Sequence, residues 1–218
     1  MKLVRLGTRA VAVTAAALLA CGVAAAPAAA TGTPKPKGTK SLAAVLTSDK
    51  SGFDHNSKDF DIVTAAVLAV LKAKPKSPVG VLANGTKPLT AFVPTDAAFQ
   101  QLVADLKGTH TWPSERQTFT AVAGLGINTV EAILLYHVVP GATIDRAAAL
   151  KSDGVELKTA TGAKISVDVR SYWHTKGVRL VDADRNDRDP RVVAFDVNKG
   201  NKQIAHAIDQ VLRPSDLP

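Results

Sequence analysis

The chain has 218 residues, of which 27 are Lys or Arg and 19 are Asp or Glu, giving a formal net charge of +8. Three of the basic residues and none of the acidic ones lie in the first 30 positions, so the remainder is only mildly basic. This weak excess argues against nucleic-acid binding. The single cysteine, Cys21, lies in an N-terminal apolar run. Disulfide scaffolds, Cys-ligated zinc sites and cysteine nucleophiles are therefore excluded from the rest of the chain.

The first 30 residues have the pattern of an export signal. Lys2, Arg5 and Arg9 precede an uncharged run over 10–30 that is mostly Ala, Val and Leu and ends in the small residues APAAA. These are the three parts of a secretory signal peptide, with cleavage expected after Ala30. The mature protein is therefore expected to be secreted, either extracellular or associated with the cell surface.

Two alternatives remain for this segment. The sequence Leu18-Leu19-Ala20-Cys21 resembles a bacterial lipobox, in which Cys21 becomes a lipidated first residue and anchors the protein. The apolar run is also of borderline length for an uncleaved membrane anchor. We favour cleavage after Ala30, because the apolar residues continue past Cys21 to a good cleavage site.

A Pro- and Lys-containing linker, TGTPKPKGTK, is predicted over 31–40. Its prolines favour an extended chain, and Lys35, Lys37 and Lys40 keep it solvated. We interpret it as a spacer. The alternative is a basic tether that contacts an anionic cell envelope.

Helical periodicity dominates the first half of the mature chain. Helices are predicted at 42–46 after Ser41, at 60–74, at 96–106 after Thr95, at 115–123 with a capping box of Ser114 and Gln117, and through Leu135 with a capping box of Asn128 and Glu131. The apolar face of the 60–74 helix is expected to comprise Ile62, Ala65, Ala66, Leu68, Ala69 and Leu71. A short strand is expected at 88–93.

After residue 150 the apolar period changes to two. Alternation is found at 164–169, at Val178 and Leu180, at 193–197 and at 204–208, and each stretch predicts a half-buried strand. Helices followed by strands indicate an α+β fold rather than a βαβ repeat.

Three segments carry a family resemblance. They are TAFVPTDAAF at 90–99, LLYHVVPG at 134–141, and NKQIAHAIDQVLRP at 201–214, which VVAFDV precedes. Their order and spacing resemble those of the fasciclin domain, over about residues 41–214, with a short tail at 215–218. The resemblance implies a wedge-like β-sandwich with helices packed around it, and an adhesive rather than enzymatic role.

The first motif has structural roles that follow from its residue types. Phe92 and Phe99 are expected to anchor the core, Pro94 to end the strand, and Thr95 or Asp96 to cap the following helix. An adhesive contact or a catalytic acid is the alternative role for Asp96.

The Tyr136–His137 pair lies in the second motif. The resemblance implies that His137 hydrogen-bonds near Asp96, which would join the first two motifs through a buried polar contact. The same two residues could act as a base and its orienting partner, but no nucleophile with a recognisable signature accompanies them.

In the third motif, His206 shares a strand face with Ile204 and Ile208, and we interpret it as a hydrogen-bonded core residue. Asp209 is expected to pair with the backbone or with Arg213. Structural roles are therefore expected for nine motif residues: Phe92, Pro94, Thr95, Asp96, Phe99, Tyr136, His137, His206 and Asp209.

Tyr172, Trp173 and His174 stand between two predicted strands. Three consecutive rings cannot all point inward from a strand, so at least one is expected at the surface. They form the candidate binding surface, with burial of Trp173 as the alternative.

Asp182, Asp184 and Asn186 begin like a calcium loop, but Asp187 replaces the required Gly and Val193 the required Glu. We interpret the loop as solvated and neutralised by its own arginines. No metal, cofactor or catalytic residue is expected anywhere in the chain.

The sequence therefore predicts an exported, non-enzymatic module that engages cell-envelope material, polysaccharide or an extracellular protein. One alternative is a secreted hydrolase that uses Asp96 and His137. The other is an envelope protein that binds a small molecule of the haem type through Tyr136, His137 or the candidate binding surface. The oligomeric state and the identity of the partner are not predicted.

Overall fold

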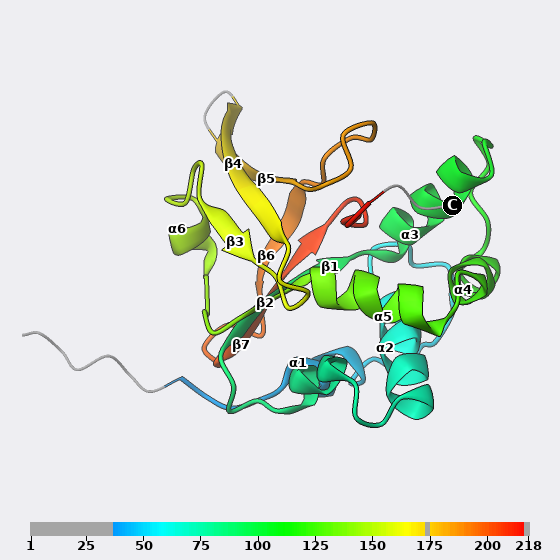
Figure 1. Cartoon of the computed structure of the whole chain (residues 1–218), viewed down its shortest axis with the longest axis horizontal. Helices are drawn as coiled ribbons and strands as arrows, with labels where there is room; N and C mark the ends of the chain where they lie inside the picture. The colour runs from blue at the N-terminus through cyan, green and yellow to red at the C-terminus, as the bar shows by residue number, and fades with distance from the viewer. Residues whose placement is uncertain (1–36, 173–174, 216–218) are drawn as a thin grey trace, which may run out of the picture. The chain divides into compact units, whose positions relative to one another are not determined.

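The computed structural model describes residues 37–172 and 175–215 (Figure 1). Helices occupy mainly the first half: α1 (Leu42–Leu46), α2 (Asp61–Ala73), the 3₁₀ helix η1 (Pro78–Ala83), α3 (Asp96–Leu106), α4 (Glu115–Gly124), α5 (Ile127–Tyr136) and α6 (Arg146–Ala149). Strands occupy mainly the second: β1 (Leu89–Pro94), β2 (Val138–Pro140), β3 (Glu156–Lys158), β4 (Lys164–Tyr172), β5 (Thr175–Val181), β6 (Val192–Val197) and β7 (Gln203–Ile208). The predicted α+β class is confirmed.

The strands form two sheets. One has the order β2-β1-β7-β6, and the other is an antiparallel sheet of order β3-β4-β5. In the first sheet β1 and β7 are parallel over their whole length, from the pair Leu89–Gln203 to the pair Pro94–Ile208. Strands β2 and β6 flank this pair in the antiparallel sense.

Both faces of the four-stranded sheet are covered. Helices α1 to α5 pack on one face around Leu89, Ala91 and Val93 of β1. The second sheet packs on the other face, where Phe92 and Ile208 contact its apolar side chains. Figure 1 shows the β3-β4-β5 sheet and the α2-α4-α5 group on opposite sides of β1 and β7. Every residue of β1 and β7 is therefore buried, as in a sheet covered on both faces.

Two predicted apolar faces are wrong. Helix α2 buries Ile62, Val63, Ala66, Val67 and Val70, whereas Leu68 is 50% exposed. The buried residues of α2 still recur at helical spacing, but the buried face is shifted by about one residue from the predicted face.

In β6 the expected alternation fails at Val193, which is 57% exposed. The register of β6 against β7 shifts twice along the strand. Each irregularity changes the face that the following side chains occupy, so a strict period of two does not apply.

The predicted helix caps are confirmed where the signal is local. Ser41 caps α1, Thr95 caps α3, and Ser114 with Gln117 forms the capping box of α4. The second predicted box, Asn128 with Glu131, is wrong because α5 begins at Ile127, after Gly126.

The predicted linker is wrong at its last residues. Gly38 pairs with Asn201, and its N–H donates to the Gly200 carbonyl at 2.8 Å. A Cβ on Gly38 would lie 2.3 Å from Asn201 Oδ1, so a side chain there would displace the Asn201 side chain, which accepts from Lys40 N at 3.0 Å. The ordered domain therefore begins by residue 38. Residues 31–36 lie outside the described part.

In the described part of the chain, no single helix has the length and apolarity to span a membrane. Helices α4 and α5 are long and apolar enough only when they are taken together, and the chain bends by 106° between them.

Gln203 connects the sheet to the helical layer. Its side chain is fully buried, and it accepts from Leu42 N and donates to the carbonyls of Val81 and Asn84, each at 2.8 Å.

We predict that Gln203→Ala lowers the free energy of unfolding by about 3 kcal/mol, because three backbone groups lose their partner. Urea denaturation measures this. Gln101→Ala, at a partly exposed helix position, should change it by less than about 0.5 kcal/mol.

Candidate functional site

Asp96 joins two helices. It is the first residue of α3 and is fully buried, while Thr95 caps that helix by accepting from Ala98 N at 3.3 Å. The Asp96 carboxylate instead accepts from the N–H groups of Asp61 at 3.1 Å and Ile62 at 2.9 Å. These belong to the first turn of α2, whose N-cap residue provides no side-chain bond. Asp96 is therefore the N-terminal cap of α2, supplied from a neighbouring helix.

The loop before α2 returns the contact. Asp96 N donates to the Asp59 carbonyl at 3.1 Å, and Ala97 N donates to the Ser57 carbonyl at 2.8 Å. The first N–H groups of α3 therefore bond to the loop before α2, and the first N–H groups of α2 bond to the Asp96 side chain. This reciprocal bonding fixes the loop over residues 53–60 against both helices.

His137 follows α5 and is buried. Its Nε2 accepts from Leu212 N at 2.9 Å, so Nδ1 carries the hydrogen that the Ile133 carbonyl accepts at 2.7 Å. Burial lowers the pKa of His137 to about 4, so the ring is neutral at pH 7. The expected hydrogen bond between His137 and Asp96 is wrong, because both ring nitrogens are bonded to the backbone elsewhere.

The cavity beside His137 is small. Apolar side chains from α1, α2, β1 and α5 surround a space of about 30 Å³, enough for about one water molecule. Tyr136 is also fully buried, and its hydroxyl donates to the Lys164 carbonyl at 3.1 Å. Burial raises the pKa of Tyr136 to about 12. Neither ring is presented to a ligand of the size of haem.

His206 lies at the centre of the other core. It is fully buried on β7 between the rings of Phe92 and Phe195, at centroid distances of 5.9 and 5.3 Å. Its Nδ1 accepts from Asp196 N at 3.2 Å, and its Nε2 donates to the Ile144 carbonyl at 2.8 Å. Burial lowers the pKa of His206, so this ring too is held neutral.

Asp209 accepts from Arg191 N at 2.7 Å and from Arg188 Nη1 at 3.0 Å. Of the two expected partners of Asp209, the backbone is confirmed, through Arg191 N, whereas Arg213 is not a partner. Arg213 instead forms ion pairs with Asp184, Asp187 and Asp105. Arg213 thus neutralises the acidic loop that begins at Asp182, from a position distant in sequence.

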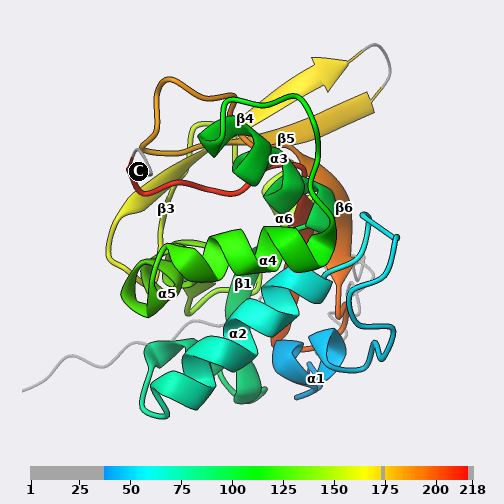
Figure 2. The same cartoon turned by 90° about the vertical axis from the view of Figure 1, so that its right-hand side faces the viewer.

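A second acidic group lies where three helices begin. Asp61, Asp96 and Glu115 are the first residues of α2, α3 and α4, respectively. Figure 2 shows the starts of α2 and α4 near each other, beside the loop that precedes α2. This loop contributes Asp54 and Asp59. We call the five residues the acidic cluster.

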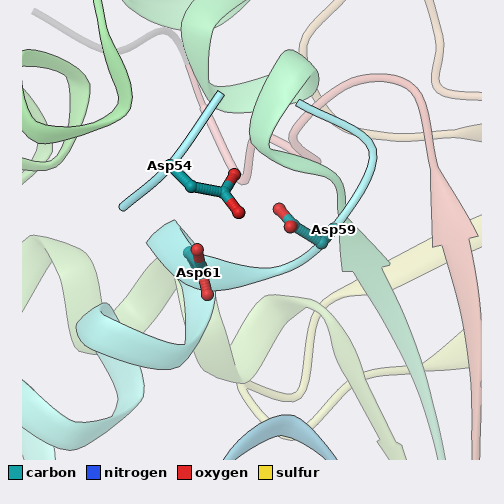
Figure 3. Close-up of side chains that lie close together, drawn as sticks. All are labelled: Asp54, Asp59 and Asp61. Atoms are coloured by element: carbon teal, nitrogen blue, oxygen red, sulfur yellow. The ribbon is translucent and has the colours of Figure 1, made fainter. Parts of the chain in front are cut away.

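The acidic cluster contains two close sets of oxygen atoms. One carboxylate oxygen from each of Asp54, Asp59 and Asp61 lies within 4.8 Å of the others, and the same holds for Asp59, Asp96 and Glu115. In Figure 3 the carboxylates of Asp54 and Asp59 point toward each other beside the start of α2. Asp59 belongs to both sets, so the five side chains form one connected group.

Burial and mutual repulsion disfavour negative charge in the cluster. Burial, with a smaller contribution from Asp59, raises the pKa of Asp61 to about 6. Burial and the neighbouring Asp59 side chain raise the pKa of Asp96 well above its usual range. Burial also raises the pKa of Glu115, which is 2% exposed.

Of these five residues, only Asp96 belongs to a motif that the sequence singles out. The local signal is an acidic residue at the first position of each helix, which usually indicates a favourable interaction with the helix dipole. That signal carries no information on whether the three helix starts meet in space. Their convergence appears only when the helices are packed.

The candidate binding surface lies at the margin of the described residues. Strands β4 and β5 are paired up to Tyr172 and Thr175. Trp173, His174 and the side chain of Tyr172 lie outside the described part, as do Cys21 and the predicted signal peptide.

The raised pKa of Asp61 has a consequence for stability. The carboxyl ionises near pH 3.8 in the unfolded chain and near pH 6 in the folded protein. The folded protein therefore binds the proton more tightly, and this group makes the protein less stable as pH rises through that range. Asp61 Oδ2 has no hydrogen-bond partner in the part of the chain that the structure describes, so an amide in its place breaks no bond seen there.

We predict that Asp61→Asn leaves the stability unchanged below about pH 4 and raises it by about 1 kcal/mol above pH 6. Urea denaturation across this range, in buffer free of divalent cations, measures the difference. Both proteins share the histidine titrations, which cancel in the comparison. A variant that is less stable than the wild type at pH 8 would contradict the prediction.

The comparisons with known proteins agree with this geometry. No curated protein matches the chain. Among solved structures, the FAS1 domain pair of the insect cell adhesion molecule Fasciclin I is similar, with a TM-score of 0.55 and 18% identity. The match covers 81% of this chain and 51% of that one, so the chain spans about half the length of its structural neighbour. The Fasciclin domain family model matches residues 64–214. Because this match covers more than half of the sequence, the chain belongs to the fasciclin domain family.

Proposed function

We propose that this protein is an exported, non-enzymatic adhesion module that binds cell-envelope material, polysaccharide or an extracellular protein. The observation that carries the proposal is membership of the fasciclin domain family. The structural neighbour is a cell adhesion molecule, which supports the same class of role.

The burial of the motif residues supports a scaffold role for them. The Asp96 carboxylate and both nitrogens of His137 are hydrogen-bonded to backbone groups inside the protein. Neither residue is placed to touch a substrate, and they do not contact each other through these bonds. This arrangement weakens the alternative of a hydrolase that uses Asp96 and His137.

The partner is proposed to bind at the end of the β4–β5 hairpin, through Tyr172, Trp173 and His174. Rings at the end of a hairpin would offer flat apolar faces with polar edges, which suit both sugars and protein side chains. Lys176, exposed on β5, adds positive charge near this position, whereas Arg170 on β4 is paired with Asp168 at 2.8 Å.

We predict that Trp173→Ala weakens binding to cell-envelope material or purified polysaccharide at least about tenfold, because aromatic anchors dominate such contacts. Pull-down of the purified chain at low and high salt measures this. The control is Trp112→Ala, which removes the only other tryptophan, itself 50% exposed.

Binding that resists salt and depends on Trp173 supports the proposed surface. Binding that disappears with salt and survives Trp173→Ala assigns the contact to the lysines of residues 31–40 instead. Absence of binding to either material contradicts the proposed envelope partner and favours a protein ligand.

Export is the second part of the proposal. We predict that the protein recovered from the medium of an expressing bacterium begins at Thr31, because the small residues before it suit signal peptidase. Intact-mass measurement tests this, and Cys21→Ser should leave both the mass and the yield unchanged. A membrane-bound product that carries a lipid on Cys21 would instead establish the lipobox alternative.

A further inference from the structure

The acidic cluster lacks positive partners among the described residues. Among the described residues, none of its five carboxylates forms an ion pair with Lys, Arg or His, although the chain has a net charge of +8. Two cationic residues adjoin these acids in the sequence. Lys58, which precedes Asp59, is exposed and forms no ion pair among the described residues. Arg116, which follows Glu115, places its guanidinium 5.4 Å from the centre of the Phe53 ring. The cluster is thus a largely buried group of acids for which the described residues supply no basic partner.

Unpartnered oxygen atoms are concentrated in this place. Of the seven buried side-chain atoms without a hydrogen-bond partner in the described residues, three are Asp59 Oδ1, Asp61 Oδ2 and Glu115 Oε2. Glu115 is 2% exposed, and one of its carboxylate oxygens lies within 4.8 Å of oxygens of both Asp59 and Asp96. Buried acceptors without donors are costly, so a group that accepts their electron pairs would stabilise the fold.

The separations within each set of three oxygens suit one cation. Oxygen atoms that coordinate one Ca²⁺ at about 2.3–2.6 Å lie no more than about 5 Å apart. Each set of three oxygens meets this limit on its own, and the two sets share Asp59, which makes that residue the common ligand. The cluster contains only carboxylates, which favours a hard cation over zinc or copper, whose sites usually include His or Cys.

We propose that Asp54, Asp59, Asp61, Asp96 and Glu115 form a calcium site centred on Asp59, at the point where the N-termini of α2, α3 and α4 meet. Asp96 and Glu115 close the site from the interior. Asp54 is exposed and would bind the ion from the solvent side. The bound ion would fix the 53–60 loop to three helices. This proposal does not depend on the adhesion function.

Thermal unfolding of the full chain, stripped of metal with a chelator, tests the site. At pH 7.5 and constant ionic strength, calcium at about a hundred times its Kd should raise Tm by about 5–10 °C. Titration calorimetry should give one ion per chain. Magnesium should produce a smaller shift, because it prefers a rigid octahedral site and sheds its water reluctantly.

Two variants make the test specific. Glu115→Gln keeps the shape of the side chain but removes the inner charge, and we expect it to weaken calcium binding at least about tenfold. In metal-free buffer it should melt at or above the wild-type temperature, because repulsion is relieved. Asp54→Asn, at an exposed position, should also weaken binding without affecting folding. The control is Glu156→Gln, an exposed partner of Lys164 on the other sheet, which should respond to calcium as the wild type does.

The pH dependence separates calcium from protons. Protons compete for the same oxygens, so the calcium-induced rise in Tm should grow between pH 5 and pH 8. Three results would each overturn the proposal: no shift with calcium at pH 7.5, an equal shift with a matched concentration of KCl, or a shift that Glu115→Gln and Asp54→Asn both retain.

Discussion

The parallel pairing of β1 with β7 is the constraint on which the rest of the structure depends. These strands are more than 100 residues apart in the sequence, and they run side by side through all six residues of each. A parallel pair needs both faces covered and a long connection. The intervening chain therefore supplies helices for one face and the β3-β4-β5 sheet for the other, which produces the two apolar cores.

The end of β1 sets the position of Asp96. The last bond of the sheet here joins Thr95 N to the Ile208 carbonyl at 3.2 Å. The chain then turns directly into α3, so Asp96 is held at the edge of the sheet, where it reaches the first turn of α2. A residue that looks like the cap of its own helix therefore caps another, because sheet geometry brings two helix starts together.

The buried histidines and the buried acids differ in how fully they are hydrogen-bonded. Each ring of His137 and His206 has one nitrogen that accepts from an N–H and one that donates to a carbonyl, so a neutral ring is fully satisfied. The acids at the helix starts have no equivalent arrangement. Asp96 is bonded to two N–H groups, but Asp59 beside it repels its charge. The histidines therefore have structural roles, whereas three of the acids keep a carboxylate oxygen without a hydrogen-bond partner among the described residues.

Prediction from sequence succeeded where the signal is local. The bounds of α3 and β1 and the caps at Ser41, Thr95 and Ser114 follow from neighbouring residues, and they were predicted closely. The start of α5 was misplaced because Glu131 pairs with Lys74 and Ser77 on another segment, and not with its own helix start. The face of α2 and the bond of His137 were also set by packing. Such partners are distant in sequence and leave no local pattern.

The two acidic regions show this limit most clearly. The loop from Asp182 begins with the spacing of a calcium loop, yet Arg213 arrives from the C-terminal segment and forms ion pairs with Asp184 and Asp187. The acidic cluster has no such spacing, because its residues come from one loop and the starts of three separate helices. A sequence motif identifies ligands only when they come from one continuous segment. The carboxylates of the acidic cluster come from separate segments that helix packing brings together, so no motif in the sequence marks them.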